Sequence, residues 1–366
     1  MIRRTVAIAV KELLQLFRDW RTMLTLLVMP MVLLLIYGFA LSFDIEHIRL
    51  VVIDHDDTRP AREVREAFLR SGYFDLVASG HDERGLDRLF DTGEAQAALV
   101  IPAGYGADLA ARRATSVQFV LDGADARTAT VILAYARQIV GSVSPIVRAR
   151  GATAATGLPL VWFNPDLSSA RFLVPGLVAF ILMVSSVIAT ALAVVREKER
   201  GTMESLRATP MVAIELLVGK TLPYLAVASV AATGALTLAW ALFDVPVRGS
   251  LFWLAVVTVL YLAGGLAFGV LISTLADTQQ MAFQASLIVS MLPTLLLSGF
   301  IFPISSMPPV VQAITHVVPA RYFLVALRAI VLKGAGPEVW WDQALALVAY
   351  GAVVLGLATV RTVRSL

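Results

Sequence analysis

Three neighbouring residues, Gly219, Lys220 and Thr221, have the types that end a phosphate-binding loop. Such a loop also needs a glycine five residues before the first of them, and position 214 is an isoleucine. It needs a preceding strand as well, whereas the pattern here predicts a helix entering a membrane. We therefore reject the loop, and the chain shows no recognisable nucleotide site of its own.

Other residues that could do chemistry also fail to form a predicted site. Gly104-Tyr105-Gly106 follows a predicted strand, but Leu109 stands where a dinucleotide-binding turn needs its third glycine. We interpret the run DHDD at 54–57 as a polar loop, because hard-cation sites need six or more arranged oxygens. The histidines lack metal-ligand spacing, and no serine or histidine falls in a nucleophile motif. The sequence thus predicts that the chain is not an enzyme.

The most informative segment is the charged run REKERGTMESLRATP at 196–210, which lies between two long apolar runs. A helix is predicted to enter this segment and to break at Gly201. Thr202 can then cap a short second helix with Glu204 in its first turn, where the helix dipole favours an acid. A charged hairpin of this kind, held at a membrane face, can receive force from a soluble partner and pass it to the spans.

Composition places the chain in the membrane class. Of its 366 residues, 58% are hydrophobic and 16% charged, and the mean hydropathy is +0.78. A soluble domain of this length would expose too much apolar surface. The sequence contains no cysteine, which excludes disulfides and thiolate metal sites.

Six apolar runs predict six transmembrane helices. About 20 apolar residues cross the hydrocarbon core of a bilayer. The sixth run is shorter than that, and we expect Trp340 and Trp341 to extend it as interfacial anchors. The runs are 22–43, 172–195, 222–243, 251–275, 281–302 and 344–360.

Residues 1–21 predict an amphipathic helix that lies in the membrane interface before the first span, 22–43. Its apolar side is Val6, Val10, Leu13, Phe17 and Trp20, and its polar side is Arg4, Lys11, Gln15 and Arg18. We expect Lys11, Leu13, Phe17 and Arg18 to mark this interfacial helix.

The distribution of lysine and arginine predicts that both termini face the cytoplasm. The N-terminal segment, the connection between the second and third runs and the C-terminal tail are rich in both residues, whereas the connection between the third and fourth runs holds only Arg248. The long segment 44–171 is then outside. Strand-like runs at 50–54, 74–79, 95–101 and 117–122 alternate there with helical patterns, and 160–163 is considered as a further strand.

The predicted fold class is therefore an α-helical polytopic membrane protein with six transmembrane helices and an inserted extracytoplasmic α/β domain. The other spans and their connections occupy 172–366. Within them, 303–341 predicts a re-entrant or interfacial segment at the outer face, because its helix at 320–334 is too short to span. Arg321 and Arg328 share a face of that helix, and with Pro303 and Pro319 they are candidates for an outer gate. A structural plug is the alternative.

No Asp, Glu, Lys, Arg or His lies between the ends of the six predicted spans. Ion-coupled transporters place ionisable groups at mid-membrane as relays. The energy source for any transport is therefore expected outside the membrane.

The segment EKERGTMESLRATP resembles the cytoplasmic coupling segment of ABC transporter type-2 permeases, in the branch with a large outer domain after the first span. Further matches are KELLQLFRD before the first span, LDGADARTA at 121–129, and GFIFPISSMP and VPARYFL near the end. They occur in the same order, so the resemblance covers essentially the whole chain.

The resemblance implies the permease subunit of an exporter of drug-like or lipophilic compounds in the bacterial inner membrane. ATP and Mg would bind to separate ABC ATPase subunits, and this chain would bind no cofactor. The other implied partners are a second copy or a paralogue, the lipid bilayer and, in some members, a periplasmic adaptor, but no nucleic acid. The residues implied to couple to the ATPase are Glu197, Glu199, Arg200, Gly201, Thr202, Met203, Glu204 and Leu206.

Two other classes stay open on the residues alone. A secondary transporter or channel would need no ATPase, but the uncharged spans disfavour it. A membrane-anchored sensor would bind a ligand with its outer domain, but six packed spans exceed what an anchor needs.

Overall fold

The computed structural model describes residues 2–40, 47–80, 86–111, 113, 115–121, 126–149, 169–201 and 212–365. The chain divides into two compact units. The helical unit consists of Met1–Ser42 with Ser168–Leu366, and the α/β unit is Phe43–Leu167. Each has its own hydrophobic core.

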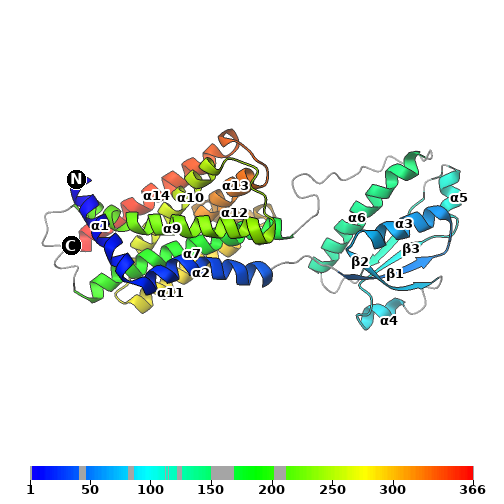
Figure 1. Cartoon of the computed structure of the whole chain (residues 1–366), viewed down its shortest axis with the longest axis horizontal. Coiled ribbons are helices and arrows are strands. Elements are labelled where there is room, and N and C mark those ends of the chain that lie inside the picture. The colour runs from blue at the N-terminus through cyan, green and yellow to red at the C-terminus, as the bar shows by residue number, and fades with distance from the viewer. Residues whose placement is uncertain are drawn as a thin grey trace. The chain divides into compact units, whose positions relative to one another are not determined.

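In the part of the chain that the structure describes, six helices of the helical unit are long and apolar enough to cross a membrane, as predicted. They run roughly side by side, while α1 (Ile2–Arg18) crosses them at the end that carries both termini (Figure 1). The six are α2 (Trp20–Ala40), α7 (Ser169–Glu199), α9 (Ala213–Phe243), α10 (Leu251–Ser273), α11 (Gln279–Leu297) and α14 (Pro337–Ser365).

Two of these helices, α9 and α14, start seven or more residues before the apolar runs. Because α9 begins at Ala213, Glu215 and Lys220 lie within a spanning helix, and the prediction that no charge lies between the helix ends is wrong. Because α14 begins at Pro337, Trp340 is turned inward, where it is 2% exposed and packs against Trp253 with ring centroids 5.7 Å apart. The predicted interfacial anchoring by Trp340 is therefore also wrong, since protein and not lipid headgroups surrounds this ring.

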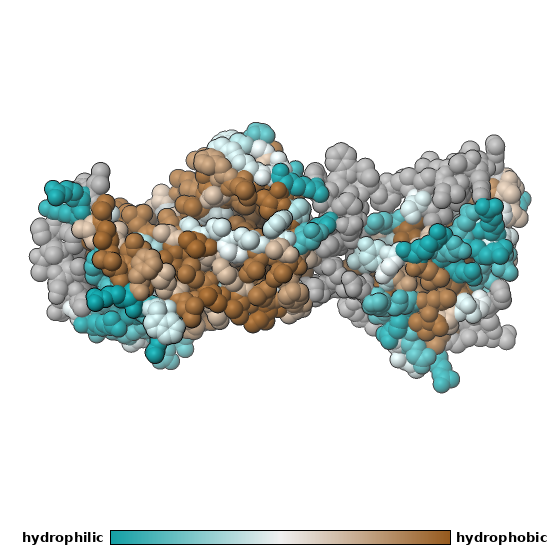
Figure 2. All heavy atoms as spheres, in the orientation of Figure 1, coloured by the Kyte–Doolittle hydropathy of each residue, from teal (hydrophilic) through white to brown (hydrophobic). Residues whose placement is uncertain are grey.

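α7 and α10 form the centre of the helical unit. In their most apolar stretches 67% and 61% of residues are buried, against 28% or fewer in the other four spans. Gly265 and Gly269 of α10 lie where the two helices meet, and a side chain at Gly269 would overlap the carbonyl of Val187 on α7. These two small residues thus form a close helix contact. Figure 2 shows the broad apolar surface of the helical unit, as suits helices in hydrocarbon.

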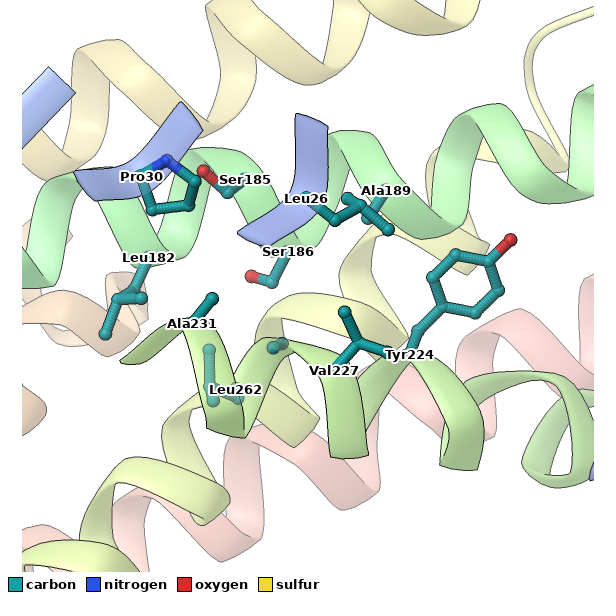
Figure 3. Close-up of a pocket in the computed structure, with 11 residues that line it drawn as sticks. Leu26, Pro30, Leu182, Ser185, Ser186, Ala189, Tyr224, Val227, Ala231 and Leu262 are labelled. Carbon is teal, nitrogen blue, oxygen red and sulfur yellow. The ribbon is translucent and has the colours of Figure 1, made fainter. Parts of the chain in front are cut away.

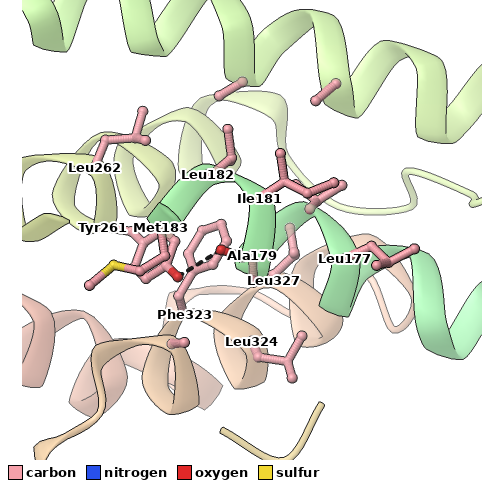
Figure 4. Close-up of a cluster of buried hydrophobic side chains, with 14 of the residues drawn as sticks. Leu177, Ala179, Ile181, Leu182, Met183, Tyr261, Leu262, Phe323, Leu324 and Leu327 are labelled. Atoms are coloured by element: carbon pink, nitrogen blue, oxygen red, sulfur yellow. Dashed lines mark hydrogen bonds between the residues drawn. The ribbon is translucent and has the colours of Figure 1, made fainter. Parts of the chain in front are cut away.

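The segment after α11 turns into the core. It begins with η1 (Ile304–Ser306), and then α12 (Pro309–Ile314) and η2 (Thr315–Val317) meet α13 (Pro319–Val331) at a bend of 84°. Phe323 of α13 stacks on Tyr261 of α10 with ring centroids 4.1 Å apart. The Tyr261 hydroxyl donates to the carbonyl of Ala179 on α7 at 2.8 Å (Figure 4). α13 is thus packed between the spans of the helical unit.

The α/β unit is built on a sheet with strand order β2-β1-β3-β4 among the described residues. β1 is parallel to β2 and β3, and β4 is antiparallel to β3. The strands are β1 (Ile48–Asp54), β2 (Phe74–Gly80), β3 (Ala97–Ile101) and β4 (Gln118–Leu121). The helices are α3 (Arg59–Arg70), α4 (Leu86–Asp91), α5 (Tyr105–Ala110) and α6 (Ala126–Ala149). These elements lie where the alternating pattern predicted them, and the strand considered at 160–163 lies outside the described residues.

Asp56 joins the loop after β1 to the loop after β3. Its carboxylate accepts hydrogen bonds from the amides of Gly104 and Gly106, both at 2.8 Å, and from the Thr58 hydroxyl. Burial opposes ionisation of Asp56, but these donors outweigh burial and hold its pKa below the ordinary value. The carboxylate therefore occupies the turn at 104–106 as a structural group. In the described parts of the chain, no three His, Asp or Glu side chains gather as a metal site would require.

Candidate functional site

Gly201 ends α7 as the sequence predicted. α7 runs to Glu199, and the Gly201 amide donates to the carbonyl of Lys198 at 3.2 Å. The φ angle of Gly201 is 71°, in the left-handed region that glycine adopts without strain. The other predicted coupling residues in this run, Thr202, Met203, Glu204 and Leu206, lie outside the described residues.

Beside this helix end, four charged side chains from three elements form an ion-pair cluster: Lys11 and Glu12 of α1, Glu197 of α7 and Lys220 of α9. Lys11 Nζ lies 3.1 Å from Glu197 Oε1 and 3.0 Å from Glu12 Oε1. Lys220 Nζ lies 3.5 Å from Glu12 Oε1 and also pairs with Glu197. Two cations face two anions, so the cluster as a whole is neutral.

Burial makes the ion-pair cluster costly to break. The side chains of Lys220, Glu12 and Glu197 are 5%, 7% and 14% exposed. A buried charge that loses its partner destabilises a protein by about 3–5 kcal/mol. We infer that the cluster holds α1, α7 and α9 in one arrangement.

Gly219 lets α1 approach α9 closely enough for these pairs to form. A Cβ at Gly219 would lie 2.9 Å from both the carbonyl oxygen of Thr5 and Cβ of Ile8 on α1. That is too close for any side chain, so glycine is required here. Gly219 and Lys220, which resemble the end of a phosphate-binding loop in sequence, instead form the surface on which α1 packs.

α1 packs on α9 with a face that the sequence prediction did not single out. Ile8, Glu12 and Leu16 are only 8%, 6% and 4% exposed. Of the residues expected to mark the interfacial helix, Leu13 is half-buried, and Lys11, Phe17 and Arg18 are exposed. The apolar stripe that the sequence identified therefore points away from the protein.

Lys198 and Glu199 join the end of α7 to the connection between α10 and α11. Lys198 Nζ pairs with Asp277 and donates to the carbonyl of Ala276 at 3.2 Å. Glu199 accepts hydrogen bonds from the amide of Gln279 at 2.7 Å and from its side chain. Arg200 is exposed. The end of α7 is thus connected to the first turn of α11 as well as to α1 and α9.

Asp19 connects the junction between α1 and α2 to α7. Its carboxylate accepts hydrogen bonds from the hydroxyl and the amide of Thr22, at 2.6 and 3.3 Å, and pairs with Arg196 at 3.3 Å. The Thr22 hydroxyl first, then the Thr22 amide and Arg196, hold the pKa of Asp19 below its ordinary value of 3.8. Asp19 is therefore an ionised cap that fixes where α1 ends and the span begins.

At the opposite end of the helical unit, the four outer-gate candidates do not form one cluster. Arg321 donates to the Thr315 hydroxyl in η2. Arg328 reaches other elements: it donates to the carbonyls of Gly299 and Phe172, at 3.3 and 3.1 Å, and lies 4.2 Å from the centroid of the Phe172 ring. Pro303 precedes η1, and Pro319 begins α13.

A small cavity lies between α2, α7, α9 and α10 (Figure 3). Its walls include Leu26, Pro30, Ser186 and Tyr224, and its volume is about 20 Å³. That is space for about one water molecule, whereas ligand pockets measure roughly 300–1,000 Å³. In this conformation the cavity cannot hold a drug-sized compound.

Glu12 and Lys220 are the residues of the ion-pair cluster that sequence reasoning missed. The sequence carried one signal for Glu12, which stands between Ile8 and Leu16 at intervals of four, as an acid within an apolar helical face. Lys220 was considered only as part of the rejected phosphate-binding loop and among the basic residues that set the orientation. Its partners lie far away in the sequence, so no local pattern reveals them.

The family model for "ABC-2 family transporter protein" matches residues 20–360. The chain is 34% identical to the probable multidrug ABC transporter permease YbhS of Escherichia coli K12, over 100% of this chain and 98% of that protein. It is 30% identical to the probable multidrug ABC transporter permease YbhR of the same organism, over 94% of each chain. A third relative, the inner membrane transport permease YhhJ of Escherichia coli K12, is 27% identical over 98% of this chain and 97% of that protein.

Proposed function

This chain belongs to the ABC-2 family of transporter proteins, and from that premise we propose that it is the permease subunit of an ATP-driven exporter of lipophilic, drug-like compounds. The permeases of this family lack a nucleotide-binding domain, so ATP and Mg bind to a separate ATPase subunit. The names of YbhS and YbhR as multidrug permeases support the substrate class.

We further propose the assembly and its orientation. Two permease relatives of this chain occur in one organism, which supports a dimer with a paralogue, and a second copy of this chain is the other arrangement. The bias of lysine and arginine supports cytoplasmic termini and an α/β unit outside. The name of YhhJ supports the inner membrane. A periplasmic adaptor would then meet the α/β unit.

The observation that carries the proposed coupling is the ion-pair cluster. Residues 202–211 connect the end of α7 to the start of α9, and the cluster ties both of these ends to α1. A push by the ATPase on this connection therefore displaces α7 and α9 together. Because α7 lies at the centre of the helical unit, its displacement changes the packing of most spans. Glu197, Glu199, Arg200 and Gly201 would position the connection, and Thr202, Met203, Glu204 and Leu206 would contact the ATPase.

Gly201→Pro tests this coupling role. Proline fixes φ near −65°, which is incompatible with the 71° at Gly201. In the permease–ATPase complex reconstituted in vesicles, we expect the variant to lose drug-stimulated ATP hydrolysis while the complex still co-purifies. The matched control is Gly93→Pro, because Gly93 of the α/β unit has a similar φ of 68° but lies in another turn. Normal stimulation in Gly201→Pro would contradict the proposal.

A further inference from the structure

α1 presents an apolar stripe to its surroundings instead of to the protein. Val6 and Val10 are each 50% exposed, Leu14 is 60% exposed and Phe17 is 59% exposed. These residues recur at intervals of three and four, so they lie on one face of the helix. The helix buries a different face on α9, through Ile8, Glu12 and Leu16. A continuous apolar stripe is unfavourable in water and needs an apolar cover.

The position of α1 puts this stripe at the membrane surface. α1 ends at Arg18, and the spanning helix α2 begins at Trp20, so only Asp19 separates them. α1 does not continue the direction of the spans but crosses them at their end (Figure 1). A helix so placed lies in the plane of the interface, where its apolar face reaches the boundary between headgroups and acyl chains.

Most of the exposed charges of this segment are cationic. The segment has two acids. Glu12 pairs with Lys220 and Lys11, and Asp19 pairs with Arg196. The other exposed cations are Arg3, Arg4, Arg18 and Arg21. Basic residues beside an inserted apolar face attract anionic lipids. Neutral lipids provide the apolar cover but not the opposite charge.

We propose that the exposed face of α1 is a binding surface for anionic phospholipids. Val6, Val10, Leu14 and Phe17 insert among the acyl chains. Arg18 and Arg21 bind the lipid phosphates, and Arg21 stands beside Trp20, whose ring centroid is 6.0 Å from the guanidinium. Lys11 of α1 pairs with Glu197 at the end of α7. The helix that binds lipid is therefore joined directly to the ion-pair cluster.

The lack of cysteine in the sequence allows a direct test, because Leu14→Cys supplies a single site for a fluorescent label. The labelled full chain is reconstituted in vesicles of phosphatidylcholine with a minor fraction of phosphatidylglycerol. In separate samples, one lipid or the other carries a nitroxide quencher at the same acyl depth and the same total amount. We expect quenching by both lipids, and markedly stronger quenching by phosphatidylglycerol.

Arg18→Gln/Arg21→Gln in this background is expected to abolish the difference between the two lipids while quenching itself persists. Arg59→Gln/Arg62→Gln on α3 is the matched control, with two exposed arginines at the same spacing in the α/β unit, and should leave the difference unchanged. Equal quenching by the two lipids in the parent chain would overturn the preference for anionic lipid. Absence of quenching would overturn membrane contact, and loss of quenching when the ATPase subunit is added would identify a protein-docking surface instead.

Discussion

Lys220 is the residue on which the ion-pair cluster depends most. It is 4% exposed on a spanning helix, a position where an ammonium group without partners would be strongly unfavourable. Its pairs with Glu12 and Glu197 offset part of that penalty and at the same time join three elements. The sequence predicted Glu197, Glu199 and Gly201 because they stand together in one charged run. It could not predict Lys220 or Glu12, because the pairing depends on how α1 lies on α9.

Lys220→Met tests how much the ion-pair cluster contributes to the stability of the helical unit. The variant keeps an unbranched side chain but leaves Glu12 and Glu197 without a buried cation, which should destabilise the helical unit by about 3–5 kcal/mol. The measurement is thermal unfolding of the full chain in detergent. Adding Glu12→Gln should restore part of the lost stability, because one uncompensated carboxylate is removed. If the double variant is no more stable than Lys220→Met, the ion pair between Lys220 and Glu12 does not account for the lost stability.

The pKa of Asp19 predicts a dependence on pH at the junction of α1 and α2. Because its pKa is lower in the folded chain than the ordinary value of 3.8, ionised Asp19 stabilises the fold above that value, and this stabilisation is lost as the pH falls through the lower folded value. Asp19→Asn lacks this contribution. The difference in unfolding temperature between the parent chain and Asp19→Asn should stay constant from neutral pH down to about 5 and narrow below 3.8. If the difference in unfolding temperature stays constant at acidic pH as well, ionised Asp19 does not stabilise the junction.

At the scale of the elements, the sequence predicted which segments form helices better than it predicted what they touch. Run lengths and alternation gave the spans and the sheet, since each pattern follows from the period of a single element. The apolar stripe of α1 was predicted from the sequence. The burial of a second face of α1 on α9 was not predicted, because periodicity does not show which neighbour a helix meets. The apolar length of α13 suggested a short helix, whereas its stacking on Tyr261 depends on a residue of α10.

Gly269→Ala tests the contact between α7 and α10. The added methyl group meets the backbone of Val187, which cannot rotate away, so we expect destabilisation of about 1–3 kcal/mol. Gly356→Ala on α14 is the control, because nothing lies within 4 Å of a Cβ there. That variant should be neutral or slightly stabilising, since alanine favours helix by about 1 kcal/mol over glycine. Equal effects of the two variants on thermal unfolding would show that helix propensity, and not the close contact, decides.

At the scale of the whole molecule, the chain separates a spanning unit from a water-facing unit within one sequence. The α/β insertion interrupts the helical unit after α2, and each unit encloses its own core. The composition predicted this division, because the spans are almost free of charge whereas the insertion alternates short strands and polar helices. The distribution of lysine and arginine additionally predicts how the chain is oriented in the membrane.

Single cysteines test that orientation, since the parent chain has none. Arg62→Cys lies on α3 of the α/β unit and Arg200→Cys lies at the end of α7, and both positions are exposed. In cells with a permeable outer membrane, a membrane-impermeant maleimide should label Arg62→Cys directly. It should label Arg200→Cys only after the inner membrane is opened. The reverse pattern would invert the proposed topology.

The bend of 84° between η2 and α13 also bears on the number of membrane crossings. A helix pair that folds back adds no crossing and leaves six, whereas a broken span would be a seventh. Both termini lie at the same end of the helical unit (Figure 1), as an even number of crossings requires. We therefore expect a protein fused to the C-terminus to meet the same compartment as one fused to the N-terminus.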